Sequence, residues 1–488
     1  MNKKISLTNE QRNFFTLVAD AVVANPFSDK RKQLDMEIAG FFLDSPGKNI
    51  IDKTIKGVMS RISELEKQGL TIHNFEGNDR LLIETTFLFD FFYKFRKNFD
   101  ELILQQIKAG DTSIKVSFVR AAYKMLESRG FDNASINLYF ALCYQIRRAF
   151  YFIRDSLKGK SAIMQDLKRK LWNNVFTHDL RMYSKYLYNR MEDFSTLILG
   201  ETGTGKGTAA SAIGKSGFIP FDEKKKCFEE SFVRSFVSLN LSQFPETLLE
   251  SELFGHKKGS FTGAVENFEG VFQKCSKNGA IFLDEIGEIS EPVQIKLLQV
   301  LQERVFSQVG SHKQERFNGR VIAATNRNFE SIENGDVFRD DFYYRLCSDI
   351  INVPPLRQRI REEPDELKEL VIITVKRIIG KDSSECIEMV LDVIENQLGF
   401  NYQWPGNVRE LEQCTRSVLL NKHYLSKNKI NKGVEELLVS GLVKGEIGAH
   451  ELMSGYCTLL YERFANFEEV ARRTGLDRRT VKKYIDST

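Results

Sequence analysis

A glycine-rich loop with a single lysine is the first stretch of the sequence whose residue types could do chemistry. It reads "LILGETGTGKGTAASAIG" over residues 197–214, after an apolar run and before a helical pattern. Glycines let backbone N–H groups turn toward an anion, and the N-terminus of a following helix favours negative charge. Lys206 would then reach the β- and γ-phosphates of a nucleotide. The candidate binding residues are Gly200, Glu201, Thr202, Gly203, Thr204, Gly205, Lys206, Gly207 and Thr208.

The loop departs from the strict P-loop pattern at one position. That pattern has Ser or Thr directly after the lysine, where the hydroxyl binds magnesium. Gly207 occupies this position here, and Thr208 lies one step further round the helix. We therefore do not assign the metal to Thr208.

An acidic pair supplies the second half of a nucleotide site. "GAIFLDEIGE" places Asp284 and Glu285 at the end of an apolar strand pattern. An aspartate there can hold Mg²⁺, and an adjacent glutamate can polarise the attacking water. Acidic strand ends are common, so the glycine-rich loop at a suitable separation is what favours this interpretation. "AATN" closes the next strand pattern, so Asn326 or Thr325 would also face the γ-phosphate.

Three arginines could stabilise charge on a transferring phosphoryl group. Arg339 and Arg345 lie in "FRDDFYYRL", and Arg409 lies in "WPGNVREL". Arginine suits this role, and an arginine finger is often supplied by a neighbouring molecule. Each arginine alone is more often part of a surface salt bridge, so their co-occurrence with both nucleotide motifs carries the assignment.

A short loop presents an aromatic residue between two glycines. In "GHKKGSFTGA" a Phe261-Thr262 pair follows a basic run and lies between Gly259 and Gly263. Glycine at both ends costs backbone order, and an exposed phenylalanine is poorly hydrated. The expectation is that this tip contacts a partner.

The pattern of apolar and polar residues along the chain predicts the elements that must position these residues. From Thr196 onward, short apolar runs alternate with helical stretches, which favours an α/β domain with a largely parallel sheet. From Leu356 to about residue 421 the pattern is helical, as in a small lid.

The N-terminal residues 1–158 place aromatic and aliphatic residues at three-to-four spacing. This predicts a helical bundle with an aromatic core; the alternative is a ligand pocket lined by those aromatics. The region lacks the alternating strands and early acidic pair of a receiver domain, which argues against control by phosphorylation. The basic helical stretch 167–190 joins it to the next domain and is well placed to transmit strain. We expect the bundle to repress in the absence of its signal.

The C-terminal segment "YERFANFEEVARRTGLDRRTVKKYI" indicates helix, turn, helix. Gly475 would end the first helix and Asp477 would cap the second. The residues expected to pack between them are Val470, Ala471, Leu476, Val481 and Ile485. The second helix suits the major groove and its phosphates, although a basic helix that only faces solvent remains the alternative. Its candidate DNA-binding residues are Arg478, Arg479, Thr480, Lys482 and Lys483.

Taken together, these residue blocks resemble the AAA+ activators of sigma-54 RNA polymerase, the bacterial enhancer-binding proteins. The resemblance covers about residues 165–425 in the family order, and the C-terminal segment resembles the Fis-type helix-turn-helix. It implies a ring, usually a hexamer, that hydrolyses ATP with Mg²⁺ to remodel a closed promoter complex into an open one. The matching blocks are "GETGTGKG", "LLESELFGHKKGSFTGA", "GAIFLDEIGE", "RVIAATNRN", "FRDDFYYRL" and "WPGNVRELE".

The resemblance also implies roles at matching positions. Lys206 binds phosphate, Asp284 holds magnesium and Glu285 is the catalytic acid. Asn240 relays the nucleotide state to that glutamate, and Asn326 senses the γ-phosphate. The remaining assignments are Arg339 and Arg345 as finger candidates and Arg409 as the lid sensor.

The loop "GSFTGA" is similar to the family's GAFTGA loop, which contacts sigma-54 and moves with the nucleotide cycle. Ser260 replaces the usual alanine, and Gly207 stands where the family usually has glutamate. The sigma-54 contact residues implied are Gly259, Ser260, Phe261, Thr262, Gly263 and Ala264.

Composition sets the remaining bounds. A net charge of +4 means that any nucleic-acid contact needs a local basic patch. The N-terminus lacks an apolar signal-peptide core, and Glu84 and Asp90 interrupt the most apolar window, so we expect no membrane role. The seven cysteines never form C-x-x-C, as in reduced, mostly buried thiols of a cytoplasmic protein.

The sequence thus predicts a multidomain chain: an N-terminal α-helical bundle, a central α/β AAA+ P-loop ATPase with a helical lid, and a C-terminal helix-turn-helix. We expect an ATP-dependent activator that binds upstream double-stranded DNA as a homo-oligomer and remodels sigma-54 RNA polymerase. The alternatives are an AAA+ ATPase that remodels another target, and a DNA-binding repressor with a vestigial nucleotide fold. The expected boundaries are 1–158, 159–355, 356–425, 426–445 (linker) and 446–488.

Overall fold

The computed structural model describes residues 4–40, 50–335, 337–399, 401–424, 442, 445 and 447–486 of the 488-residue chain. These group into two compact units, Met1–Leu370 with Gln403–Leu411, and Val371–Tyr402 with Glu412–Thr488. The linker expected over 426–445 lies outside the described residues, apart from Leu442 and Gly445.

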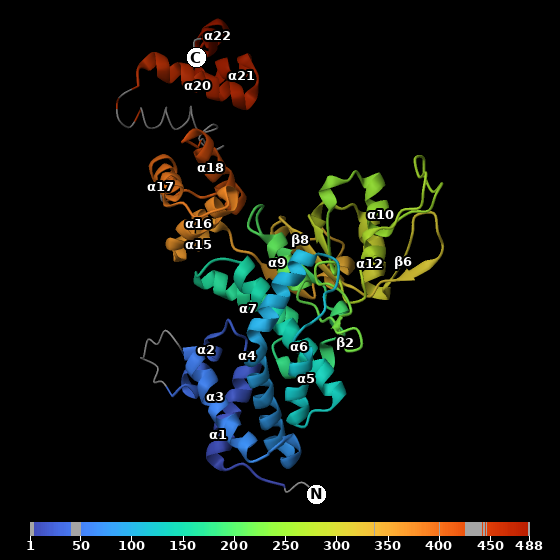
Figure 1. The fold of residues 1–488 in the computed structure, drawn as a ribbon. Helices are drawn as coiled ribbons and strands as arrows, with labels where there is room; N and C mark the ends of the chain where they lie inside the picture. The colour runs from blue at the N-terminus through green and yellow to red at the C-terminus, as the bar shows by residue number, and fades with distance from the viewer. Residues whose placement is uncertain are drawn as a thin grey trace. The chain divides into compact units, whose positions relative to one another are not determined.

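Long helices make up the N-terminal part of the first unit (Figure 1). They are α1 (Asn9–Val23), α2 (Asp29–Ile38), α3 (Ile50–Lys67), α4 (Gly77–Ala109), α5 (Val119–Ser128) and α6 (Asn133–Tyr151). In α4, Phe87, Phe91, Phe95 and Phe99 recur every fourth residue, which places them on one face, and all are buried. The expected helical N-terminal region is therefore confirmed.

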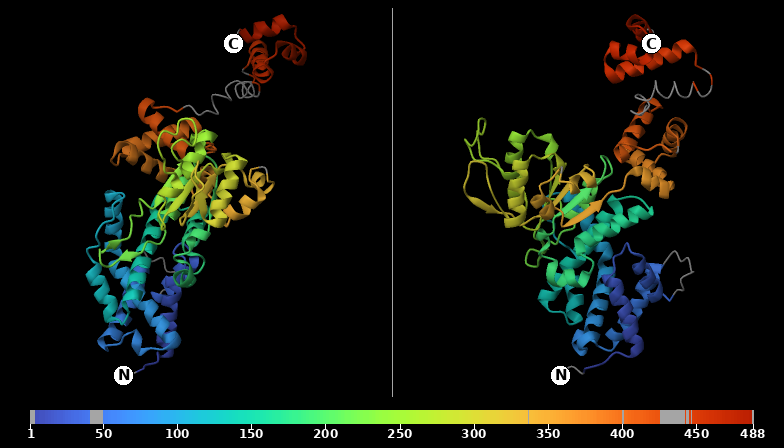
Figure 2. Two further views of the ribbon diagram at one scale, coloured as in Figure 1. Left: turned by 90° about the vertical axis from the view of Figure 1, so that its right-hand side faces the viewer. Right: turned by 180° about the vertical axis from the view of Figure 1, so that it is seen from behind.

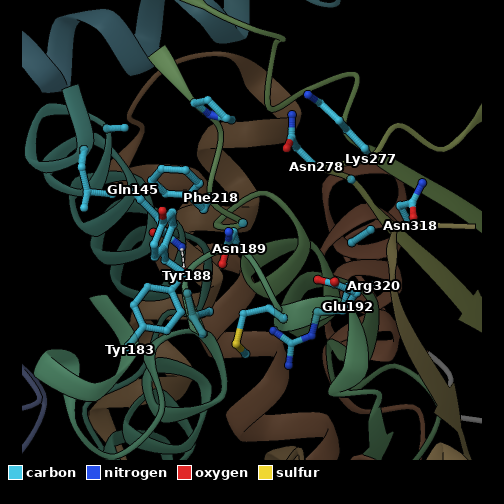
Figure 3. A pocket seen from close by; sticks show the side chains of 18 of the residues that line it. Gln145, Tyr183, Tyr188, Asn189, Glu192, Phe218, Lys277, Asn278, Asn318 and Arg320 are labelled. Carbon is cyan, nitrogen blue, oxygen red and sulfur yellow. Dashed lines mark hydrogen bonds between the residues drawn. The ribbon is translucent and has the colours of Figure 1, made fainter. Parts of the chain in front are cut away.

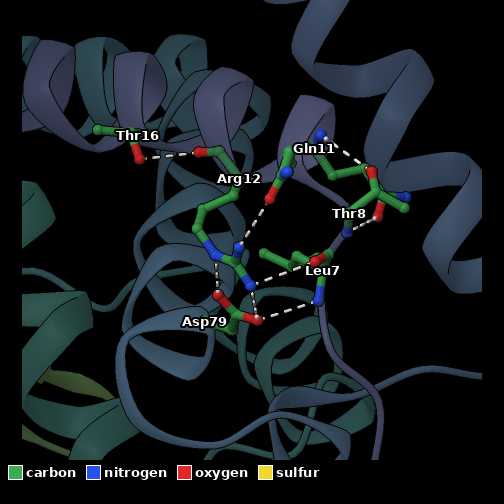
Figure 4. A network of polar contacts seen from close by, with 7 residues as sticks. Leu7, Thr8, Gln11, Arg12, Thr16 and Asp79 are labelled. Carbon is green, nitrogen blue, oxygen red and sulfur yellow. Dashed lines mark hydrogen bonds and ion pairs between the residues drawn. The ribbon is translucent and has the colours of Figure 1, made fainter.

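An ion pair fastens the first helix to α4 (Figure 4). The Thr8 side chain caps α1 by accepting from the Gln11 amide at 3.2 Å. Arg12 Nε lies 2.8 Å from Asp79 Oδ1, and the Leu7 amide donates to Asp79 Oδ2 at 2.9 Å. The hydrogen bond from Arg12 is the main reason that the pKa of Asp79 lies below its ordinary value.

A five-stranded sheet in the order β4-β5-β8-β1-β9 forms the centre of the first unit. Its strands are β4 (Phe236–Asn240), β5 (Ala280–Asp284), β8 (Arg320–Thr325), β1 (Thr196–Leu199) and β9 (Asp349–Asn352). All four neighbouring pairs are parallel, which confirms the expected α/β domain. Parallel sheets need both faces covered.

The two faces of the sheet belong to two separate apolar cores. In β8, Ile322 and Ala324 join the core that contains α9 (Lys206–Gly214), whereas Val321 and Ala323 join the other core. This is the two-residue alternation of a strand. The helices that cover the sheet include α7 (Ala162–Phe176), α9, α10 (Glu246–Phe254), α12 (Glu291–Glu303) and α14 (Asp340–Leu346).

The N-terminal bundle lies next to the domain that holds the sheet (Figure 2), and the apolar core on the α9 face continues into the bundle. Phe140 and Tyr144 of α6 pack on the hairpin of β2 (Phe221–Asp222) and β3 (Cys227–Phe228). The Tyr144 and Phe228 ring centroids are 4.2 Å apart, and those of Phe140 and Phe221 are 4.8 Å apart. The bundle and the sheet therefore share one apolar core, and the aromatic residues of α6 serve packing between them.

Polar contacts reinforce this junction. The fully buried Arg148 donates to the carbonyl oxygens of Lys215 and Gly217, at 2.9 and 2.7 Å. Gln145 Nε2 donates to the Ser216 carbonyl at 2.9 Å. These carbonyls directly follow the last turn of α9. Helix α6 of the bundle is therefore hydrogen-bonded to the C-terminal end of α9, the helix that begins at Lys206.

The remaining elements are mostly helical. The shorter ones of the first unit are α8 (Leu180–Met182), α11 (Val271–Lys274), β6 (Val305–Ser307), β7 (Gln314–Arg316), α13 (Phe329–Glu333) and α15 (Leu356–Glu362). Helices α16 (Asp365–Ile379) and α18 (Asn407–Asn421) cross between the two units, and α17 (Ser384–Val393) lies in the second.

Three helices close the described chain: α20 (Ala449–Phe464), α21 (Phe467–Thr474) and α22 (Arg478–Asp486). They pack around Cys457, Val470 and Val481, and the other residues expected to pack, Ala471, Leu476 and Ile485, lie against this cluster. The seven cysteines of the chain are free thiols, each buried or half-buried. No helix in the described ranges has the length and apolarity needed to cross a membrane.

Candidate active site

The glycine-rich loop links the end of β1 to the start of α9, as the sequence predicts. Gly203 and Gly205 have φ angles of 81° and 105°, in the left-handed region that favours glycine. A Cβ at Gly203 would lie 2.3 Å from the carbonyl oxygen of Gly406, so no larger residue fits there. The loop is thus shaped by backbone geometry that its glycines permit.

Lys206 is buried at the start of α9, and its amine is held by the loop itself. Nζ donates to the carbonyl oxygens of Gly200 and Glu201, at 2.8 and 3.3 Å. Burial lowers the pKa of Lys206, and the nearby carboxylates of Glu285 and Asp284 oppose this. An amine that is buried beside these acids and donates to loop carbonyls fits a site in which phosphate oxygens take the place of those carbonyls.

The acidic pair lies at the carboxyl end of β5, the same edge of the parallel sheet as the loop. Glu285 has a φ of 58°, an uncommon conformation for a residue with a side chain, and its amide donates to Asp284 Oδ1 at 3.1 Å. Among the described residues nothing hydrogen-bonds the buried Glu285 Oε2. Burial is the main reason that the pKa of Glu285 is raised. An unpaired buried carboxylate oxygen fits a group that binds water or a ligand.

A cavity of about 460 Å³ opens beside Glu285. Glu288, Asn326 and the segment that includes Leu241 and Leu249 also line it. Asn326 lies at the end of β8, and its Nδ2 reaches Thr202 Oγ1 of the glycine-rich loop at 3.5 Å. The structure thus brings Asn326 together with both halves of the expected site.

The other predicted strand-end residues have local partners. Asn240 pairs with Asp284 in the β4–β5 register, and its Oδ1 accepts from the amide and hydroxyl of Ser242 at 3.1 and 2.8 Å. Thr325 is buried, and its Oγ1 accepts from the Arg327 amide. Of the two residues that "AATN" offered, Asn326 is therefore the one that faces the loop.

Two residues that the sequence reading did not assign hold the loop in place. Arg357 Nη1 donates to Glu201 Oε2 at 2.8 Å, and Asn407 Nδ2 donates to the same oxygen at 3.1 Å. The hydrogen bond from Arg357 is the main reason that the pKa of Glu201 is lowered. Asn407 belongs to the "WPGN" block, which was a usable signal, whereas nothing near Arg357 in the sequence marks it.

The candidate arginines fall into two groups. Arg409 is exposed, and its Cβ lies 3.0 Å from the place that a Cβ at Gly203 would take, so it belongs to the loop's surroundings. Arg339 forms ion pairs with Asp341, at 3.2 Å, and with Glu291. Arg345 Nε donates to the Leu301 carbonyl at 2.9 Å. The structure places Arg339 and Arg345 on or beside α14, with partners outside the glycine-rich loop.

The loop of residues 259–264, here called the partner loop, is folded back on its own base. Phe261, expected to be exposed, is half-buried, because its ring packs edge-on against His256 with 4.9 Å between centroids. The Gly259 amide donates to the Ala264 carbonyl at 2.8 Å, which closes the loop. Thr262 is exposed at the tip.

The two glycines that flank Phe261 and Thr262 adopt backbone conformations that favour glycine. Gly259 and Gly263 have φ angles of 82° and 103°, and nothing lies within 4 Å of a Cβ built on either. Ser260 instead packs closely on Gly310 of the β6–β7 hairpin, where a Cβ would lie 2.5 Å from the serine Cβ. Its buried Oγ has no hydrogen-bond partner in the described residues. A small residue is thus required opposite Ser260.

The candidate DNA-binding residues lie on α22 in the second unit. Asp477 caps this helix by accepting from the amides of Arg479 and Thr480, at 3.0 and 3.1 Å. Gly475 ends α21 in the left-handed conformation, as expected. The basic side chains are exposed: Arg478, Arg479, Lys482 and Lys483.

Comparison with known proteins finds relatives of the central part of the chain. The family model described as the sigma-54 interaction domain matches residues 173–352. Over 229 residues the chain is 44% identical to a Nif-specific regulatory protein of Azotobacter vinelandii, which covers 47% of this chain and 40% of that protein. Over 294 residues it is 38% identical to the nitrogen fixation protein AnfA of the same organism, which covers 59% of this chain and 51% of that protein.

A crystal structure of NtrX from Brucella abortus in complex with ATP aligns with 76% of this chain and 80% of its own, at 19% identity and a TM-score of 0.43. The chain spans about half the length of the curated relatives it matches. The glycine-rich loop, the acidic pair and the partner loop all lie inside the matched range. Residues 173–352 are therefore similar to the sigma-54 interaction domain.

Proposed function

We propose that the chain hydrolyses ATP and uses the energy to remodel sigma-54 RNA polymerase from the closed to the open promoter complex. The observation that carries the enzymatic part is that Lys206 and Glu285 lie at the same edge of the sheet. Each carboxylate of the acidic pair acts on the pKa of Lys206, so all three groups share one electrostatic environment. The unpaired Oε2 of Glu285 supports its role as the group that polarises water.

We propose that Asp284 holds Mg²⁺ beside the nucleotide, because the position after Lys206 carries no hydroxyl. Residues 200–208 bind the phosphates through backbone amides and Lys206, while Asn326 senses the γ-phosphate and Asn240 relays the nucleotide state to Glu285. The contact of Asn326 with Thr202 supports the sensor role.

Ring assembly is part of the same proposal. Arg339 and Arg345 have partners outside the glycine-rich loop of their own chain. This supports a role as arginine fingers in the nucleotide site of a neighbouring subunit. Arg409 acts within its own subunit, as its closeness to Gly203 suggests. We propose a homo-oligomer, usually a hexamer in this family, with the partner loop Gly259–Ala264 engaging sigma-54.

The C-terminal helices α20–α22 are proposed to form a Fis-type helix-turn-helix that binds upstream DNA. The exposed basic side chains of α22 and the Gly475 turn support this. The proposed parts are residues 1–158, 159–355, 356–425, 426–445 and 446–488, in a cytoplasmic protein. We further propose that the N-terminal bundle restrains ring assembly until its signal binds.

Site-directed variants test the proposed chemistry. Glu285→Gln should keep ATP binding and lower turnover by about 10²–10⁴-fold, because the water loses its base. Glu288→Gln is the matched control, since Glu288 lines the same cavity but is exposed and paired with Arg327 at 2.9 Å. Lys206→Ala should weaken nucleotide binding itself. Wild-type turnover in Glu285→Gln, measured by phosphate release, would refute the assignment.

Capture of sigma-54 separates the proposal from its alternative, a AAA+ ATPase that remodels another target. The protein should retain sigma-54 in a pull-down with ADP and aluminium fluoride, and Thr262→Ala should lose this capture while keeping ATPase activity. Failure of the unmodified protein to capture sigma-54, with normal ATPase activity, would favour the alternative.

A further inference from the structure

A second cavity lies between the N-terminal bundle and the sheet, away from the nucleotide site (Figure 3). Its volume is about 420 Å³, which falls in the range of about 300–1,000 Å³ for small-molecule sites. Ala280 and Arg320, the first residues of β5 and β8, belong to its wall. The cavity therefore opens at the amino ends of these strands, whereas Asp284 and Asn326 lie at their carboxyl ends.

The wall combines aromatic surface with uncharged polar groups. Tyr188 and Phe218 form an edge-on pair with 4.8 Å between centroids. Carboxamide side chains recur around the cavity, and Figure 3 shows Asn189, Asn278 and Asn318 among them. Such a wall suits a ligand with a planar apolar surface and hydrogen-bonding edges.

The cationic groups at the wall, Lys277 and Arg320, are already engaged by the protein, and Glu192 adds a carboxylate to the wall. Lys277 pairs with Glu229 at 3.1 Å. Arg320 donates to the Phe194 carbonyl at 2.9 Å and to Asn174 Oδ1 at 2.9 Å, and burial lowers its pKa to about 10. An anionic ligand would gain little from cations that are committed elsewhere and would be repelled by Glu192, which favours an uncharged ligand over an anion.

Gln145 leaves one acceptor unused in this wall. Its Nε2 donates both hydrogens, one to the Tyr183 hydroxyl at 2.6 Å and the other to the Ser216 carbonyl at 2.9 Å. Its Oε1 is fully buried and accepts no hydrogen bond within the described part of the chain. A buried acceptor without a donor is costly, so its presence in a cavity wall indicates that a ligand or water supplies the donor.

We propose that this cavity binds a small uncharged effector with a planar apolar surface and an N–H or O–H group for Gln145 Oε1. An aromatic amide or a nucleobase-like heterocycle has this chemistry. The effector acts on the nucleotide site, because two elements span the distance between them. Helix α9 runs from Lys206 to Gly214 at the cavity, and β5 runs from Ala280 at the cavity to Asp284. If the effector and the nucleotide favour the same conformation of these elements, binding of one strengthens binding of the other. If they favour different conformations, binding of one weakens binding of the other.

Binding of benzamide to the full-length protein tests the site. The measurement is saturation-transfer NMR with excess ADP, which keeps the probe out of the nucleotide site. Benzamide should bind saturably, while benzoate, of the same shape but charged, should bind at least about tenfold more weakly. No benzamide binding, or preferential binding of benzoate, would overturn the proposed chemistry.

Two variants locate the binding. Ala134 is an exposed residue of α6 at the edge of the cavity, so Ala134→Trp should obstruct the cavity and weaken benzamide binding about tenfold or more. Asn133→Trp is the control, because Asn133 is the exposed neighbour outside the wall. Gln145→Met should also weaken binding by removing Oε1; if this variant fails to fold, Ala134→Trp decides. Equal affinity in Ala134→Trp and Asn133→Trp would place benzamide elsewhere and overturn the site.

The effector role rests on the proposed nucleotide site and has its own readout. A fluorescent ADP analogue should bind with an affinity that changes at least about threefold when benzamide is saturating. Benzamide binding without any change in ADP affinity would overturn the effector role. If the analogue does not bind at all, the proposed function fails, whereas benzamide binding still decides whether the cavity is a site.

Discussion

Arg148 offers the sharpest test of how the N-terminal bundle is joined to the central sheet. Deleting the bundle would expose the aromatic residues of the shared core, among them Phe221 and Phe228, so a point substitution is the cleaner perturbation. Arg148→Ala removes the donors that the Lys215 and Gly217 carbonyls use. It should loosen the junction while leaving the bundle and the sheet folded.

The magnitude follows from three contributions. Two carbonyl groups left without their donors cost about 2–6 kcal/mol together, and the lost contacts of the three side-chain methylenes cost about 2 kcal/mol. Removing the buried guanidinium gives back about 3 kcal/mol, which is the penalty that lowers the pKa of Arg148 to about 10. The loss of donors and contacts outweighs this relief, and the net destabilisation is about 3 kcal/mol.

Hydrogen exchange measures this destabilisation at the junction between the bundle and the sheet. The Val116 amide donates to the Lys226 carbonyl across the junction at 2.8 Å, so its exchange reports opening. A loss of about 3 kcal/mol predicts opening on the order of a hundredfold more frequent. Arg147→Ala is the matched control, because Arg147 pairs with Asp100 inside the bundle. Unchanged exchange at Val116 in Arg148→Ala, or an equal change in both variants, would refute the reasoning.

Three further predictions concern the nucleotide site, the partner loop and α22. Because burial raises the pKa of Glu285 and the carboxylate is the active form, kcat should fall on the acid side at a higher pH than for a free glutamate; a rate that is constant down to about pH 5 would contradict this. His256→Ala removes the ring contact that folds the partner loop back, so sigma-54 should be captured about two- to tenfold more tightly in pull-down titrations, and unchanged capture would contradict it. Arg478→Ala and Arg479→Ala should each weaken binding to upstream DNA by about 5- to 150-fold in gel shifts, with ATPase activity intact. Arg472→Ala should have little effect, because the Arg472 side chain pairs with an acid of its own helix. Equal affinities in all three variants would place α22 away from DNA.

Local patterns in the sequence were sufficient for the parts of the site that depend on neighbouring residues. The conformation of the glycine-rich loop, the acidic pair after an apolar strand and the four-residue aromatic spacing of α4 are each encoded over a short range of the sequence. Backbone freedom, strand alternation and helical periodicity act within about one to four residues, so these features are visible without tertiary information.

Tertiary structure decided which distant groups meet. Glu201 and Arg357 are 156 positions apart, and Arg148 and Lys215 are 67 apart, so no periodicity links them. The folded-back Phe261 likewise depends on His256, whose backbone forms bridges with Phe268 and Val309.

The sequence by itself therefore predicted the candidate site residues at the carboxyl ends of the sheet strands and determined the helical nature of the N-terminal region. Only the tertiary structure decided that the bundle and the sheet share one core, and that a cavity with an unused buried acceptor lies at their junction. The physical reason is that burial and hydrogen-bond satisfaction select partners in three dimensions, and these selections leave no pattern along the chain.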